Sequence, residues 1–294
     1  MRTEIINTDF TNALNDREFV VATLEEFFDI ENQYNACPYT PHRLTFFAII
    51  FYMDGSGYHH IDFTDLAYDG MSIFFVCKGQ LHAFDNNKNK NGYILYFTEE
   101  FVNRNLEGFN DKLYYQLFNY ALNSPQLPVF NNNTMREDFV SLFKLMHHEF
   151  TRQDDVLKDE IIKCQLRTIL YYSERMQAKN SDFINNHKNH ALFIRLQKLV
   201  DQNIFKYRTS QHYCDQLNVG YRKLNAICKE FTSGTIRNFI DERLILEIKR
   251  LLANSDFSIK EICYKTGFDE PTNMTKFFKC HTGTVPKLFR ASFE

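Results

Sequence analysis

The chain has 294 residues, of which 44% are hydrophobic and 24% charged, a composition typical of a soluble globular protein with room for two domains. No apolar run approaches the roughly 20 residues that a membrane span needs, and the residues after Met1 lack the apolar core of a signal peptide. We therefore expect a cytoplasmic protein. The seven cysteines form no C-x-x-C pair, so the sequence predicts neither a disulfide framework nor a zinc knuckle.

The net charge of −3 is unevenly distributed along the chain. From His187 onward there are 18 Lys and Arg against 11 Asp and Glu, a balance of +7, whereas the residues before it carry 16 against 26, a balance of −10. A basic carboxy-terminal part joined to an acidic amino-terminal part indicates that only the former meets a polyanion.

The first half of the chain is predicted to be β structure. Short aromatic or β-branched segments alternate with turn-rich stretches such as Asp54-Gly-Ser-Gly57. Several short strands at close spacing are typical of a small sandwich or barrel. The predicted strands are Leu44–Phe51, His60–Phe63, Met71–Val76, Gln80–Phe84 and Tyr93–Phe97.

Two amphipathic helices are predicted to follow, because the apolar residues change from an alternating to a helical period near Asn131. Their apolar positions are Phe139, Leu142, Phe143, Met146 and Phe150, then Ile161, Ile162, Leu166, Ile169, Leu170 and Met176. These helices are expected to cover the barrel, to pair with a second subunit, or to do both. The polar stretch 177–189 is the best linker candidate, and the residues after it are predicted to be helical.

The clearest motif lies near the carboxy terminus. Ser258-Ile-Lys-Glu261 fits a capping box, in which the Ser and Glu side chains each accept a hydrogen bond from a backbone amide. Gly267 supplies the following turn, because a positive φ is cheap only for glycine. Asp269 is expected to cap the next helix, with Pro271 in its first turn. The exposed residues near the start of that helix, where a helix in the major groove reaches base edges, are Thr272, Asn273 and Lys276.

The same plan is predicted about 47 residues earlier, from the spacing of Gly220 to Gly267. A helix from Thr209–Ser210 to Asn218 leads to a turn at Val219-Gly220, and the next helix exposes Arg222, Lys223 and Asn225. Between the units, Thr235–Ala253 is predicted to be one long helix. Its ~19 residues at 1.5 Å rise give about 28 Å, near the ~34 Å repeat of successive major grooves. A purely structural helical bundle is the alternative.

Residues 191–294 resemble the DNA-binding domain of the AraC/XylS family of bacterial transcription regulators. The segments that carry the resemblance are Leu217–Asn225, Phe239–Arg250, Ser258–Cys263, Thr266–Pro271, Phe277–Gly283 and Pro286–Arg290. The resemblance implies that one major groove is read by Arg222, Lys223 and Asn225 and the next by Thr272, Asn273 and Lys276. Phosphate contacts, which position the domain without reading sequence, are implied for Arg237, Asn238 and Lys279.

The sequence departs from the family pattern at several positions. Ala226 stands where the family commonly has Arg or Lys, Gly220 where it favours Ser or Thr, and Val285 where it favours Thr. Cys214 and Cys263 replace small Ala residues. We therefore expect sequence discrimination to depend more on the second unit than on the first.

A second resemblance lies in His42–Ile49, Gly55–Phe63 and Phe74–His82. These segments look like the cupin-type β-barrel sensor domain that precedes this DNA-binding domain in many family members. The resemblance implies a pocket for a small effector such as a sugar, and adjoining helices that form a homodimer. Strand alternation gives as inward positions Phe47, Ile49, Phe74, Val76, His82 and Tyr96. A barrel filled by its own side chains, serving dimerisation or partner contact only, is the alternative.

A metal-dependent cupin enzyme is the rival interpretation of this half. Such enzymes usually present two His one residue apart, a nearby Glu and a later His, but Leu44 stands where the partner of His42 is expected. The adjacent His59 and His60 would point to opposite faces of a strand. We expect no metal, no cofactor and no catalysis, and we interpret these histidines, with His82, as solvated or hydrogen-bonded turn positions.

The sequence thus predicts an α+β protein with two domains. Residues 1–130 form a cupin-like effector-sensing β-barrel, 131–180 a helical dimerisation segment, 181–190 a linker, and 191–294 an all-α DNA-binding domain whose two helix-turn-helix units are joined by a long helix. The predicted function is sequence-specific regulation of transcription by a homodimer that binds double-stranded operator DNA, with RNA polymerase as a further partner of an activator. A non-specific nucleoid-binding protein, whose affinity depends only on salt, is the other alternative.

Overall fold

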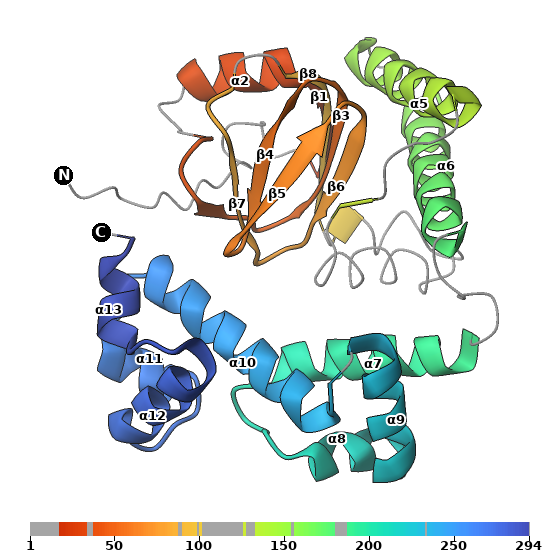
Figure 1. The fold of residues 1–294 in the computed structure, drawn as a ribbon. Helices are drawn as coiled ribbons and strands as arrows, with labels where there is room; N and C mark the ends of the chain where they lie inside the picture. The colour runs from red at the N-terminus through yellow and green to blue at the C-terminus, as the bar shows by residue number, and fades with distance from the viewer. Residues whose placement is uncertain are drawn as a thin grey trace. The chain divides into compact units, whose positions relative to one another are not determined.

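The computed structural model describes residues 18–33, 38–87, 90–98, 100–101, 126–127, 133–153, 156–179, 187–232 and 234–293. Its first half contains two antiparallel four-stranded sheets (Figure 1). One sheet has the order β1 (Phe19–Thr23), β8 (Asn91–Phe97), β3 (Phe47–Asp54), β6 (Ser72–Val76). The other has the order β2 (His42–Arg43), β7 (Leu81–Phe84), β4 (Ser56–Ile61), β5 (Thr64–Asp69). The facing sides of the two sheets share one apolar core.

Strand β3 is buried on both of its faces. Ala48, Ile50 and Tyr52 belong to the core between the two sheets, whereas Ile49 and Phe51 belong to a second core formed with helices. A strand covered on both sides needs apolar residues at every position, which accounts for the uninterrupted apolar run of this strand.

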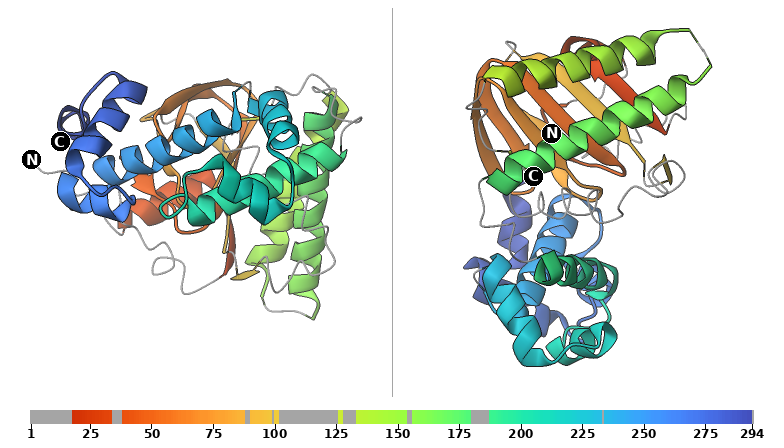
Figure 2. Two further views of the ribbon diagram at one scale, coloured as in Figure 1. Left: turned by 90° about the horizontal axis from the view of Figure 1, so that it is seen from below. Right: turned by 90° about the vertical axis from the view of Figure 1, so that its right-hand side faces the viewer.

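The helices α5 (Asn133–Thr151) and α6 (Lys158–Lys179) provide that second cover. Figure 2 (right) shows both lying across one face of a sheet, and the ring of Phe143 on α5 stacks at 4.5 Å on that of Phe51. Most of the apolar positions predicted for the two helices are buried there, namely Phe139, Phe143, Met146, Ile162, Leu166, Ile169, Leu170 and Met176. Both predicted helices are confirmed, and the structure shows them covering the sheet.

The structure adds elements that the sequence patterns do not predict, including β1, β5 and the helix α2 (Leu24–Gln33). A local signal for α2 does exist in the sequence. The Thr23 hydroxyl accepts the Glu26 amide at 3.1 Å, and the Glu26 carboxylate accepts the Thr23 amide at 2.8 Å, which is the reciprocal pattern of a capping box.

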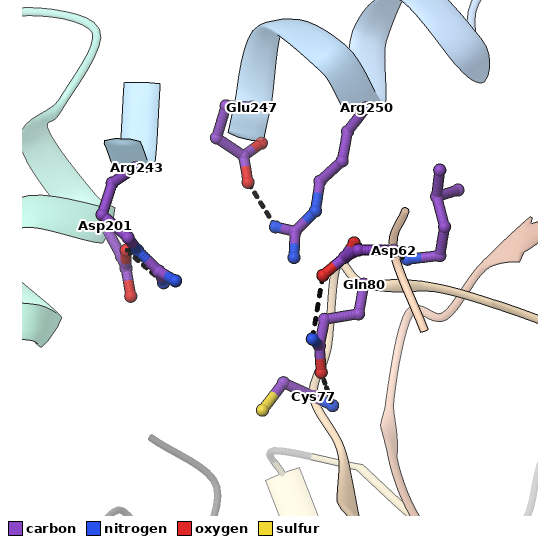
Figure 3. A network of polar contacts seen from close by, with 8 residues as sticks. Asp62, Cys77, Gln80, Asp201, Arg243, Glu247 and Arg250 are labelled. Carbon is purple, nitrogen blue, oxygen red and sulfur yellow. Dashed lines mark hydrogen bonds and ion pairs between the residues drawn. The ribbon is translucent and has the colours of Figure 1, made fainter. Parts of the chain in front are cut away.

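The predicted strand His60–Phe63 is wrong in its second half, because Asp62 lies in the turn between β4 and β5 with a left-handed φ of 54°. Its carboxylate accepts hydrogen bonds from Gln80 Nε2 at 2.9 Å and from the Leu81 amide at 3.2 Å. Gln80 Oε1 in turn accepts the Cys77 amide at 2.7 Å (Figure 3). These polar contacts join the β4–β5 turn to the β6–β7 turn.

The carboxy-terminal part is helical and has one apolar core. Its helices are α7 (His187–Asn203), α8 (Ser210–Leu217), α9 (Tyr221–Thr232), α10 (Ile236–Ala253), α11 (Ile259–Lys265), α12 (Pro271–Thr282) and α13 (Pro286–Ala291). At 1.5 Å per residue, the 18 residues of α10 span about 27 Å. In Figure 1, α8 and α9 lie near its first turns and α11 to α13 near its last.

Helix α10 is fastened to α7 by an ion pair. Arg243 donates to one carboxylate oxygen of Asp201 through Nε at 3.0 Å and Nη2 at 2.7 Å (Figure 3). The Arg243 side chain is only 10% exposed, and removing one partner of a buried charge pair leaves the other without compensation. The pair therefore holds the long helix in place.

The chain divides between Ile184 and Asn185 into two units. Helix α7 begins at His187, inside the range 181–190 that the sequence predicts as a linker, and residues 181–186 lie outside the described part. The predicted α+β architecture, with sheets and covering helices first and a helical domain second, is confirmed. None of the helices within the described ranges is long and apolar enough to span a membrane.

Candidate nucleic-acid interface and barrel interior

The second helix-turn-helix unit consists of α11 and α12. The Ser258 hydroxyl accepts the Glu261 amide at 3.2 Å, and the Glu261 carboxylate accepts the Ser258 amide at 2.7 Å, so the predicted capping box is present. Hydrogen bonds that the carboxylate accepts from the Ser258 hydroxyl and from the Ser258 backbone amide lower the pKa of the Glu261 carboxyl. Gly267 has the left-handed φ of 77° expected of it. Sequence signals that act within a few residues therefore determine this unit well.

The cap of α12 differs from the prediction. The residue before the first helical turn is Glu270, not Asp269, and its side chain makes no capping hydrogen bond. Pro271 does occupy the first turn. A proline there needs no capping of its own amide, because it has none.

The exposed side of α12 near its start carries the three side chains predicted to read bases, Thr272, Asn273 and Lys276. The opposite side is anchored by Met274 and Phe278, which are fully buried. Thr272 Oγ1 donates to Glu270 Oε2 at 3.2 Å. The geometry leaves these side chains accessible, and their contact with bases stays a prediction.

The first unit, α8 and α9, repeats the same turn with a different residue. Asn218 takes the left-handed φ of 53°, and the Val219 amide donates to the Cys214 carbonyl as the Phe268 amide does to that of Cys263. Both are Schellman turns. Asn218 is thus the counterpart of Gly267, so the predicted pairing of Gly220 with Gly267 is wrong, and the repeat of the turn is 49 residues rather than 47.

The second helices of the two units are related by 50 residues, because the second turn is one residue longer. Gly220 accepts the first amides of α9 as Glu270 accepts those of α12, and Leu224 is buried like Met274. In this alignment Ala226 takes the place of Lys276. The further pairs are Arg222 with Thr272, Lys223 with Asn273, Asn225 with Thr275, and Lys229 with Lys279.

Asn225 is half-buried, which corrects the prediction that it lies exposed beside Arg222 and Lys223. Its Oδ1 accepts the backbone amide of Ile236 at 3.1 Å. It therefore connects α9 to the start of α10. Arg222, Lys223 and Ala226 are exposed, so these remain the candidate reading positions of the first unit.

The predicted phosphate contacts Arg237 and Asn238 lie in the first turn of α10, and Lys279 lies in the last turn of α12; all are exposed. The backbone amide of Asn238 already donates to Thr235 Oγ1 at 3.2 Å. Arg237 Nε lies 2.9 Å from Asp241 Oδ2, so part of its charge is compensated. A helix N-terminus attracts anions, which agrees with a phosphate role for Arg237 and Asn238 but does not bear on Lys279, and the role stays a prediction for all of them.

Three histidines meet in the interior between the two sheets, which corrects the prediction that they are solvated or hydrogen-bonded turn positions, because they are hydrogen-bonded but buried. His42, His59 and His82 are 5%, 0% and 1% exposed. The rings of His42 and His82 are 4.3 Å apart and those of His59 and His82 5.4 Å. His60 points outward to Asp65. Because burial depends on which strands pair, periodicity along one strand could not show this cluster.

The hydrogen bonds of the cluster leave two ring nitrogens without a partner. His42 Nδ1 lies 3.1 Å from the Thr40 carbonyl, which can only accept, so the neutral ring carries its proton on Nδ1 and a lone pair on Nε2. His42 Nε2 and His82 Nε2 are buried and have no hydrogen-bond partner among the described residues. Burial lowers the pKa of all three rings, that of His59 to about 3, so they are neutral at physiological pH.

Four of the six predicted pocket residues lie in the interior between the sheets, namely Phe74, Val76, His82 and Tyr96. The other two, Phe47 and Ile49, face α5 and α6 instead, which corrects the prediction. Alternation assigns residues of β3 to two faces but cannot say which face is inner when both are apolar. The inward side chains of this strand are Ala48, Ile50 and Tyr52.

In the described part of the chain, no group of three His, Cys, Asp or Glu side chains is arranged to hold a metal ion. Leu44, at the position where a cupin metal site would need His, is buried in the apolar core. The neutral histidines instead place hydrogen-bonding atoms in the interior between the two sheets, where the Tyr52 hydroxyl lies 3.0 Å from His59 Nδ1.

Two family models match the chain in tandem. The AraC-like ligand binding domain matches residues 27–167, and the helix-turn-helix domain matches residues 213–292. The chain belongs to the AraC family of transcription regulators. It is therefore a regulator with a helix-turn-helix DNA-binding domain and an AraC-like ligand-binding domain.

Relatives of this AraC-family chain cover it to different extents. The transcriptional activator RhaS of Salmonella paratyphi A is 20% identical over 263 residues, 89% of this chain and 91% of RhaS. The probable transcription factor PqrA of Proteus vulgaris is 36% identical over 73 residues, 24% of this chain and 60% of PqrA. Among solved structures, ToxT of Vibrio cholerae covers 93% of this chain and 98% of its own, with 16% identity and a TM-score of 0.45.

Proposed function

We propose that this AraC-family regulator binds its operator by placing α9 and α12 in successive major grooves on one face of the DNA. The observation that carries the proposal is the repeat itself. Both helix pairs have the same Schellman turn, both are anchored in one core, and both expose polar side chains near the start of the second helix. The length of α10, about 27 Å, approaches the ~34 Å separation of the grooves.

The two reading helices contribute unequally in this proposal. α12 presents Thr272, Asn273 and Lys276, whereas α9 presents Arg222 and Lys223 with Ala226 in the third place. Hydrogen-bonding side chains at base edges discriminate between sequences, but a methyl group does so only at thymine. Discrimination therefore depends more on α12.

The test begins with genome-wide mapping of binding sites, which supplies the operator. Lys276→Ala and Arg222→Ala should each weaken operator binding by ~1–3 kcal/mol in gel-shift titrations. Lys198→Ala removes the same charge from an exposed position on α7 and should leave affinity unchanged. Unchanged affinity for both reading-helix variants contradicts the proposal. Equal competition by random-sequence DNA would instead favour the non-specific nucleoid-binding alternative.

The barrel interior is the proposed effector site. Buried polar atoms without partners are costly, and His42 Nε2 and His82 Nε2 supply such atoms beside the apolar core. Because His42 Nε2 bears a lone pair, it needs a ligand that presents an O–H or N–H donor. A neutral hydroxylated molecule satisfies this requirement, whereas a carboxylate oxygen has no proton to offer.

Thermal shift measurements with a panel of monosaccharides and of carboxylic acids test the effector proposal. A binder raises the melting temperature of the folded chain, and His42→Ala should remove that rise. His60→Ala, on the outer side of β4, is the matched control and should keep it. A hydroxylated binder whose effect survives His42→Ala contradicts the assignment, and a panel without binders favours the filled barrel.

Homodimerisation through α5 and α6 is part of the proposal, with RNA polymerase as a partner if the regulator activates. Apolar side chains exposed on these helices support it, since Leu145 is 57%, Ile161 40% and Tyr171 51% exposed. Light scattering that finds only monomer at micromolar concentration, with and without DNA, contradicts it.

We further propose that the protein acts in the cytoplasm at the nucleoid and is not an enzyme. Finding a stoichiometric metal in the purified protein would favour the metalloenzyme alternative instead.

A further inference from the structure

Arg208 precedes the first helix-turn-helix unit in sequence but contacts the turn of the second. Its Nη2 donates to the Thr266 carbonyl at 2.8 Å, and its guanidinium carbon lies 3.8 Å above the centre of the Phe268 ring. Thr266 and Phe268 flank Gly267 in the turn between α11 and α12. One side chain thus joins the segment that leads into α8 to the turn that aims α12.

The backbone approaches equally closely at this point. A Cβ on Gly267 would stand 2.0 Å from the Phe205 carbonyl oxygen and 3.0 Å from Arg208 Nη2. Figure 1 shows the connection between α7 and α8 running toward α11 and α12. Gly267 is therefore required for the close approach as well as for its positive φ.

A further contact ties Arg208 to the start of α10. Arg237 Nη1 donates to the Arg208 carbonyl at 3.4 Å, while Arg237 Nε is held by Asp241 at 2.9 Å. The segment before α8, the first turns of α10 and the second turn thus form one connected set of contacts around Arg208.

We propose that Arg208 is a positioning residue that fixes the separation and orientation of α9 and α12. It thereby sets the spacing that the regulator accepts between two half-sites, which are the bases read by α9 and the bases read by α12 of the same chain. The inference rests on the proposed binding of two successive grooves. Both helix pairs pack on α10, but a single helix bends and twists more easily than a closed loop of contacts. Arg208 closes that loop, because it links the segment that leads into α8 directly to the turn between α11 and α12.

The chemistry of the contact selects arginine. A guanidinium donates in its plane while its face stacks on an aromatic ring, and this geometry uses both properties, on Thr266 and Phe268. A lysine ammonium keeps the charge but lacks the flat, stacking face. Arg208→Lys is therefore an informative substitution, because it preserves the electrostatic attraction to DNA.

The experiment measures affinity of the full chain for the operator and for versions with one base pair inserted between the two half-sites. One inserted pair rotates a half-site by about 34°, so the wild-type protein should lose roughly tenfold or more in affinity. For Arg208→Lys and for Phe268→Leu, which removes the stacking partner, we expect that insertion penalty to shrink to about threefold or less. Base preferences within each half-site should stay as in the wild type.

The outcomes separate this inference from the proposed function. A normal wild-type penalty that is unchanged in both variants overturns the positioning role. The same holds if Arg208→Lys lowers affinity equally at every spacing, since that marks a DNA contact or a general loss of stability. A wild-type protein that tolerates the insertion shows instead that the two-groove proposal fails, and the positioning role with it.

Discussion

Replacing Asn225 by Ala removes the oxygen that accepts the Ile236 amide at 3.1 Å, at the start of α10. That amide is one of the helix N-terminal donors without an intrahelical partner, and Ile236 is 0% exposed, so water does not readily replace the lost acceptor. Losing a helix cap costs about 0.5–2 kcal/mol, and leaving a buried donor unpaired costs about 1–3 kcal/mol. We expect the carboxy-terminal unit to lose about 1–2 kcal/mol of stability.

Hydrogen–deuterium exchange on the full chain measures this loss where it occurs. A free-energy loss of about 1.4 kcal/mol corresponds to tenfold faster exchange, which should appear in the amides at the start of α10. Asn273→Ala is the matched control, because it removes the same amide group from the exposed side of α12. Asn273→Ala should leave hydrogen–deuterium exchange at the start of α10 unchanged but alter which bases the protein prefers in its operator. A changed base preference with unchanged exchange in Asn225→Ala would refute the structural role assigned here.

Three further outcomes follow from local geometry. Gly267→Ala should destabilise the chain by about 1–3 kcal/mol in urea unfolding. Gly220→Ala should have little effect, because a Cβ there would meet no described atom within 4 Å apart from its chain neighbours. Equal effects of the two substitutions contradict the reasoning. Ser258→Ala should cost about 0.5–2 kcal/mol in the same assay, and no cost would mean that the capping box contributes nothing. Acidification should lower the melting temperature of the amino-terminal unit. In the unfolded chain the imidazoles bind protons near pH 6.5, but burial lowers the folded pKa values of His42, His59 and His82, that of His59 to about 3. The stability that these neutral rings contribute is therefore complete above pH 6.5 and is lost progressively below it. A constant melting temperature from pH 7 to 5 contradicts this reasoning.

The sequence by itself determined features whose cause lies within a few residues. Ser258 and Glu261 form their capping box three residues apart, Gly267 makes its turn alone, and the helical period of α5 and α6 depends on their own side chains. Such patterns can be recognised in a single sequence, because the interacting groups are neighbours along the chain. The two-domain architecture and the tandem of helix-turn-helix units follow from these local patterns.

Only the tertiary structure decided which groups meet across long stretches of chain. Asn225 looked like an exposed reading residue until α10 placed the Ile236 amide beside it. β3 is apolar on both faces, so the position of α5 and α6 determined which face lines the interior between the two sheets. Arg208 and Thr266 are 58 residues apart. A contact of that kind depends on the packing of several helices at once, and no periodicity or spacing within one segment encodes it.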